Sequence, residues 1–67
     1  MDKNLLVVTA VQGYAENHGT EETEAYKKFL ELGIPSLIRR EYDAMHMQPL
    51  EETIGFAEDV MSRSTSL

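Results

Sequence analysis

The stretch that decides the fold is HGTEETEAYKKFLELGIP, residues 18–35. Gly19 suits the left-handed backbone position that follows a helix, and Thr20 can accept hydrogen bonds from the first amides of the next helix. Between these residues and Gly33, apolar side chains recur at intervals of three and four, which is typical of an amphipathic helix. Pro35 then suits the first turn of another helix. The stretch therefore predicts one helix with a break on each side.

The segments that follow also have helical periodicity. Residues 36–47 form one shorter predicted helix, and Gln48-Pro49 separates it from a last helix, with Pro49 at the first helical position. The predicted core residues from the second segment onward are Ala25, Tyr26, Phe29, Leu30, Leu32, Leu37, Ile38, Tyr42, Met45, Leu50, Ile54, Phe56, Ala57, Val60 and Met61.

The N-terminal segment is ambiguous between a strand and a helix. Its β-branched residues Val7, Val8, Thr9 and Val11 suit a strand. Val7, Val11 and Tyr14 nevertheless have helical spacing, and the sequence offers no second strand to satisfy the backbone of the first. The segment is therefore predicted to be a helix.

The chain of 67 residues has room for one domain, residues 1–67, with a single core. The predicted fold is all-α, a small bundle of four short helices with an ordered core over about residues 4–61. Residues 62–67 lack an apolar stripe and are predicted to be a flexible tail. Gly13 and Gly55 fall inside predicted helices, where each costs about 1 kcal/mol relative to alanine, so they are expected to mark close helix crossings and could face one another.

The composition excludes several classes of function. Twelve acidic and six basic residues give a net charge of -6, which argues against binding a nucleic-acid backbone. The absence of cysteine excludes disulfides and thiolate ligands, and His18 and His46 lack a metal-ligand spacing, so no metal or cofactor is expected. No apolar run approaches the roughly 20 residues of a membrane span, and the N-terminus does not resemble a signal peptide. A soluble, cytoplasmic protein without a membrane partner is expected.

A group of polar residues near the end of the third segment is the candidate site. Tyr42 and His46 lie four residues apart, so they share a helix face, and Asp43 is placed to orient the imidazole. Arg39 could bind a phosphate or a carboxylate. No nucleophile or oxyanion donor set accompanies them, so an enzyme is not expected. Two readings remain open: Tyr42 and His46 close the helix end, or the group recognises a partner through Tyr42, Asp43, His46, Gln48 and Arg39.

Three strings of sequence carry a resemblance to a known family. They are YAENH at residues 14–18, FLELG at 29–33 and YDAMHMQ at 42–48. From about Leu5 to Val60 the chain resembles a bacterial family of very small proteins called domain of unknown function 3791. The resemblance implies a compact helical module without an established activity, often encoded beside larger proteins with an ADP-ribosyltransferase-like domain. That neighbourhood implies a regulatory or neutralising partner, in the manner of an antitoxin.

The expected function is therefore binding to another protein, most plausibly within a bacterial two-gene system. The acidic surface favours a partner with a basic patch, and self-association would cover apolar surface that a monomer of this size leaves exposed. A small-ligand binder centred on Tyr42, Asp43, His46 and Arg39 is one alternative. The other is a nucleic-acid mimic that blocks a DNA-binding protein with the carboxylates of Glu21, Glu22, Glu24, Glu51, Glu52, Glu58 and Asp59.

Overall fold

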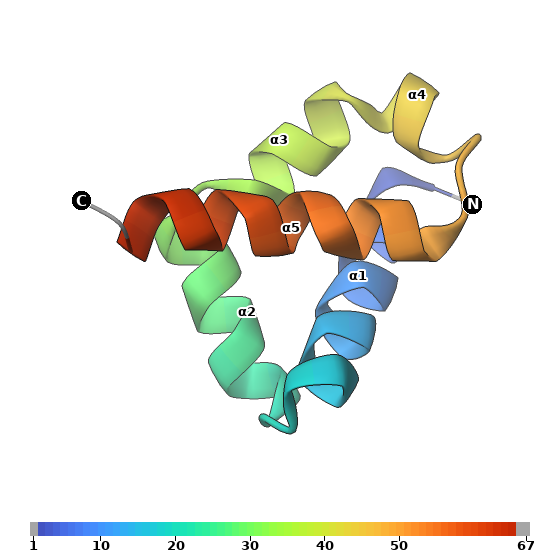
Figure 1. Cartoon of the computed structure of the whole chain (residues 1–67). Coiled ribbons are helices and arrows are strands. Elements are labelled where there is room, and N and C mark those ends of the chain that lie inside the picture. Colours follow the sequence, from blue (N-terminus) through green and yellow to red (C-terminus); the bar gives the residue numbers. More distant parts are fainter. Residues whose placement is uncertain (1, 66–67) are drawn as a thin grey trace.

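Five helices make up the chain in this computed structural model, which describes residues 2–65. α1 and α2 diverge from a tight turn, α5 crosses both of them, and α3 and α4 complete the bundle (Figure 1). No strand occurs within the described residues, so the all-α prediction is confirmed. The helices are α1 (Lys3–His18), α2 (Glu22–Glu31), α3 (Ile34–Arg40), α4 (Tyr42–Met45) and α5 (Leu50–Thr65).

The N-terminal segment is a helix throughout, as predicted. The backbone N–H of Leu5 donates to Asp2 Oδ1 at 2.8 Å, which satisfies one of the free amides of the first turn. Gly19 ends α1 in the left-handed conformation with φ 63°, where its missing Cβ removes the steric penalty. The β-branched residues are tolerated because burial of Val7 and Val11 in the core outweighs their modest preference against a helix.

Two predicted helix starts are placed differently in the structure. Glu21, not Thr20, occupies the N-cap position of α2, and its side chain makes no capping hydrogen bond. Pro49 lies immediately before α5 rather than inside its first turn, and its carbonyl accepts from the N–H of Glu52 at 3.0 Å. Pro35 does lie in the first turn of α3, as the sequence predicted.

The third predicted helix is divided in two, so the predicted four helices agree roughly with the structure: four helices have seven or more residues, and α4 is a single turn of four. Glu41 interrupts the third predicted helix with φ -96° and ψ 17°. A straight helix would carry Met45 about 10 Å beyond Ile38 along its axis. The break instead brings Met45 onto the beginning of α1, where it lines a cleft with Leu6.

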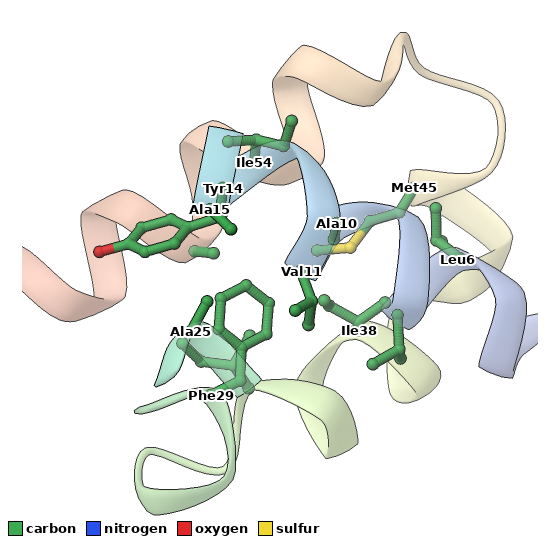
Figure 2. Packing of buried hydrophobic residues seen from close by; sticks show 13 residues of the cluster. Leu6, Ala10, Val11, Tyr14, Ala15, Ala25, Phe29, Ile38, Met45 and Ile54 are labelled. Atoms are coloured by element: carbon green, nitrogen blue, oxygen red, sulfur yellow. The ribbon is translucent and has the colours of Figure 1, made fainter. Parts of the chain in front are cut away.

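The core lies where α1, α2, α3 and α5 meet. The Tyr14 ring packs edge-on against Phe29, with 5.6 Å between ring centroids (Figure 2). Tyr26, Leu30 and Leu50 were predicted to be buried but are exposed, Leu50 the least of the three because it lines a cleft against α1. The buried apolar residues are Leu6, Val7, Ala10, Val11, Tyr14, Ala15, Ala25, Phe29, Ile34, Ile38, Met45, Ile54 and Ala57.

The two helical glycines have different surroundings. A Cβ atom at Gly13 would overlap Ile54 Cδ1 and lie 3.2 Å from its Cγ1, so Gly13 does mark a close crossing of α1 and α5. A Cβ atom at Gly55 would have no neighbour within 4 Å. The expectation for Gly55 is therefore wrong, and the two glycines do not face one another.

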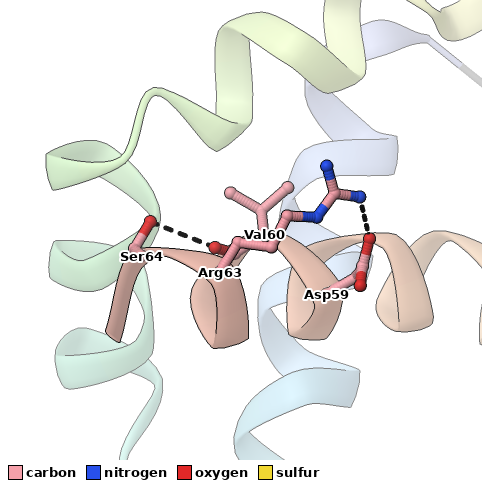
Figure 3. Close-up of polar contacts among 4 residues, drawn as sticks. All are labelled: Asp59, Val60, Arg63 and Ser64. Atoms are coloured by element: carbon pink, nitrogen blue, oxygen red, sulfur yellow. Dashed lines mark hydrogen bonds and ion pairs between the residues drawn. The ribbon is translucent and has the colours of Figure 1, made fainter. Parts of the chain in front are cut away.

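The C-terminal helix extends beyond the predicted ordered core. α5 continues through Thr65, whereas the sequence predicted a tail from Ser62. Arg63 bonds Asp59 one turn earlier, and Ser64 Oγ donates to the Val60 carbonyl at 3.0 Å (Figure 3). The hydrogen bond and the charge of Asp59 raise the pKa of the Arg63 guanidinium. The last two positions of the predicted tail, 66 and 67, lie outside the described residues.

Candidate functional site

The rings of Tyr42 and His46 stack at the end of α4. Their centroids are 4.6 Å apart and their planes differ by 8°. His46 Nδ1 lies 2.8 Å from the Tyr42 carbonyl oxygen, which can only accept, so Nδ1 carries the hydrogen and donates it. Nε2 makes no hydrogen bond within the described residues and His46 is exposed, so this nitrogen is open to a group from outside.

Two of the other predicted site residues, Arg39 and Asp43, do not join this pair. Arg39 Nε donates to Asn4 Oδ1 at 3.1 Å, which fastens α3 to the beginning of α1. Asp43 is exposed and has no hydrogen bond or ion pair among residues 2–65. The imidazole of His46 is therefore oriented by a backbone carbonyl and not by Asp43. The structure does not assemble the pocket that a small-ligand site built on Arg39 and Asp43 would require.

His46 and Gln48 instead line a small cleft between α1, α4 and α5. The cleft measures about 120 Å³, close to the roughly 150 Å³ that holds a benzene ring in a protein core. Its remaining walls are Leu6, Thr9, Met45 and Leu50. It therefore has room for about one apolar side chain and offers polar groups at its edge.

Met47 stands beside the cleft with 78% of its surface exposed, the most of any large apolar residue in the described chain. The missed cleft residues Leu6 and Thr9 come from α1, about forty positions from His46. No local pattern could have brought them together with it.

The other histidine has the same spacing to a tyrosine but a different environment. His18 stacks on Tyr14, with 4.2 Å between ring centroids. Its Nε2 lies 2.7 Å from a carboxylate oxygen of Glu58, so it donates within the chain and ties the end of α1 to α5. His46 differs from His18, because its Nε2 makes no hydrogen bond to a carboxylate within the described residues.

The chain matches the family model described as "Protein of unknown function (DUF3791)" over residues 6–63. It belongs to this family. Searches of the curated proteins and of the solved structures find no match. In this DUF3791 protein the matched region contains His46, Gln48 and the rest of the cleft. Membership in this family does not assign an activity to the chain.

Two structural findings apply to the described part of this DUF3791 protein. None of its helices combines the length and the apolar character needed to cross a membrane. Within the same residues, no three histidine, aspartate or glutamate side chains are grouped so that they could hold a metal ion.

Proposed function

We propose that this DUF3791 protein is a protein-binding module whose cleft beside His46 receives an anchoring side chain from its partner. The observation that carries the proposal is the combination at this corner of a ring-sized cleft, an open imidazole nitrogen and the exposed Met47. Residues that dominate protein interfaces are typically apolar or aromatic side chains inserted into such recesses and surrounded by a polar rim.

The charges near the cleft indicate the kind of partner. Asp43 is exposed on α4, and Glu51 and Glu52 are exposed in the first turn of α5, immediately after Leu50 of the cleft. A basic surface would complement them and would be steered toward this corner at low ionic strength. The partner that fits this proposal is a cytoplasmic protein encoded by a neighbouring gene, which the chain regulates or neutralises as an antitoxin does.

The test is to co-express the chain with the product of the neighbouring gene and to measure the affinity of the purified pair by calorimetry. Met47→Asp places a charge beside the cleft, and we expect it to weaken binding at least tenfold, or about 1.4 kcal/mol. His46→Ala is expected to weaken binding with little change in melting temperature, because the ring is exposed.

The matched control is Ser36→Asp, which adds the same charge at an exposed position of α3. It should bind like the wild type. Equal affinity of Met47→Asp and Ser36→Asp would contradict a partner at the cleft. An association rate that does not fall with rising salt would contradict the electrostatic part of the proposal.

The nucleic-acid mimic is a second candidate because acidic side chains are exposed on α5. Glu51, Glu52 and Asp59 are exposed on this helix, but Asp59 bonds Arg63, and Glu58 bonds His18. These contacts offset part of the negative charge that a mimic needs. A partner that DNA displaces from the chain would favour the mimic over the cleft.

A further inference from the structure

A second apolar surface lies between α1 and α2, away from the His46 cleft. Val8 and Tyr26 line a groove of about 280 Å³ together with Val11, Gln12, Glu22 and Thr23. Val8 is 48% exposed and Tyr26 is 44% exposed. The two helices diverge from the turn at Gly19, so the groove follows a V-shaped pair (Figure 1).

Two further apolar side chains extend this groove. Leu5, 48% exposed, lies three residues before Val8, and Leu30, 53% exposed, lies four residues after Tyr26. Residues at these spacings share a helix side. The two arms therefore carry four of the six exposed large apolar residues of the described chain.

The crossing helix does not cover this surface. Gly13 lies against the Ile54 side chain of α5. Val8 lies about 140° around the axis of α1 from Gly13, so it is on a side of α1 that α5 does not contact. Contiguous apolar surface of this kind on a small protein marks an interaction site.

Of the residues that line the groove only Glu22 is charged, and further charged residues lie near its two ends. Glu16, one turn after Gln12, and Glu22 lie near the closed end of the V. Lys27, three residues before Leu30, and Arg39, which bonds Asn4 next to Leu5, lie toward the open end. Acidic residues at one end, with Lys27 and Arg39 toward the other, make the surface complementary to a copy of itself in the opposite orientation.

We infer that a second copy of the chain covers the α1–α2 groove in a two-fold symmetric dimer. In such an interface each copy uses the same surface, so the acidic end of one V meets the basic end of the other. The 16-residue α1 and the 10-residue α2 are about 24 and 15 Å long and about 10 Å wide, so this surface amounts to about 400 Å² per copy. Stable interfaces bury about 800 Å² per partner, so the dimer is weak and dissociates on dilution.

The test is sedimentation equilibrium of the full chain without a partner, from about 10 µM to about 1 mM. We expect the mass to rise toward twice the monomer mass. Val8→Glu places a charge in the groove at an exposed position of a helix, and it should weaken dimerisation at least tenfold. Leu30→Glu is a second variant on the other arm, and Met47→Glu is the matched control at the other corner, which should dimerise like the wild type.

Mixing two variants tests the symmetry. Val8→Glu and Val8→Lys should each be monomeric, and their mixture should recover part of the association because the two positions belong to the same surface. A monomer at every concentration overturns the inference, as does a dimer that both Val8→Glu and Leu30→Glu leave intact. Larger open-ended assemblies overturn the two-fold arrangement. The result is independent of the proposed partner, since that is tested by Met47→Asp at the cleft.

Discussion

Gly13 and Gly55 each lie inside a long helix, where glycine costs about 1 kcal/mol relative to alanine. The structure gives only Gly13 a reason to be there, since a Cβ atom would overlap the end of the Ile54 side chain. Ile54 is buried, so its side chain has little space into which it could move. At Gly55 nothing opposes an added methyl group.

The two glycines therefore predict opposite effects of the same substitution. Gly55→Ala should raise the free energy of unfolding by about 0.5 to 1 kcal/mol through helix propensity alone. Gly13→Ala should lower it by about 1 to 2 kcal/mol, because steric overlap in the core exceeds that gain. Urea unfolding of both variants measures the difference. Stabilisation by Gly13→Ala would show that α1 and α5 can separate without cost.

The sequence predicts what one residue does locally but not what lies opposite it. Both glycines have the same helical context in the sequence, and the difference between them comes from Ile54, forty-one positions after Gly13. The histidines repeat this lesson. Each histidine stacks on the tyrosine four positions before it, but Glu58, which bonds only His18, is forty positions away.

At the scale of elements, the turn between α1 and α2 explains why the predicted cap was wrong. The N–H of Thr20 donates to the Ala15 carbonyl at 3.0 Å, so the backbone of Thr20 belongs to the end of α1, and the N-cap position of α2 falls on Glu21. The carbonyl of Glu21 accepts the N–H of Ala25 at 3.0 Å, but the Glu21 side chain makes no capping bond. The Glu21 side chain therefore leaves the first amides of α2 without a capping hydrogen bond.

A shorter carboxylate at the same position should repair this helix start. Glu21→Asp keeps the charge that favours the helix dipole and places an oxygen where N-cap residues accept the first amides. We expect the free energy of unfolding to rise by about 0.5 to 1 kcal/mol in urea titrations. Thr20→Ala is the control and should change stability less than the loss of a true cap. A loss of about 1 kcal/mol or more for Thr20→Ala would restore Thr20 as the functional cap.

Hydrophobic periodicity predicted which segments are helical, but not how much of each helix surface the neighbouring helices bury. Ile38 and Met45, seven positions apart, fit one continuous helix as well as the broken pair that forms. The apolar stripe of α2 was correct for Ala25 and Phe29 but too wide at Tyr26 and Leu30. The width of a buried face depends on how neighbouring helices cross, and a single helix does not encode that angle.

At the scale of the molecule, the His46 cleft combines segments that the sequence separates. His46 and Gln48 were singled out from a short string, whereas Leu6 and Thr9 enter only because the break at Glu41 returns the chain to α1. Charge also differs between the two surfaces. Acidic residues come directly after the cleft residue Leu50 on α5, whereas both acidic and basic side chains lie near the α1–α2 groove. The cleft therefore fits the proposed basic partner, and the groove fits the proposed second copy.

Self-association through the groove would also stabilise the fold. A chain of 67 residues buries only about 60% of the surface that it exposes when unfolded, so its margin of stability is small. A folded dimer adds to that margin by mass action, and its melting temperature must rise with protein concentration. Between about 10 µM and 1 mM we expect a rise of several degrees for the wild type, since about 1 kcal/mol corresponds to roughly 4–8 °C in a domain of this size. Val8→Glu should melt at one temperature throughout, and a concentration-dependent midpoint in that variant would place the contact elsewhere.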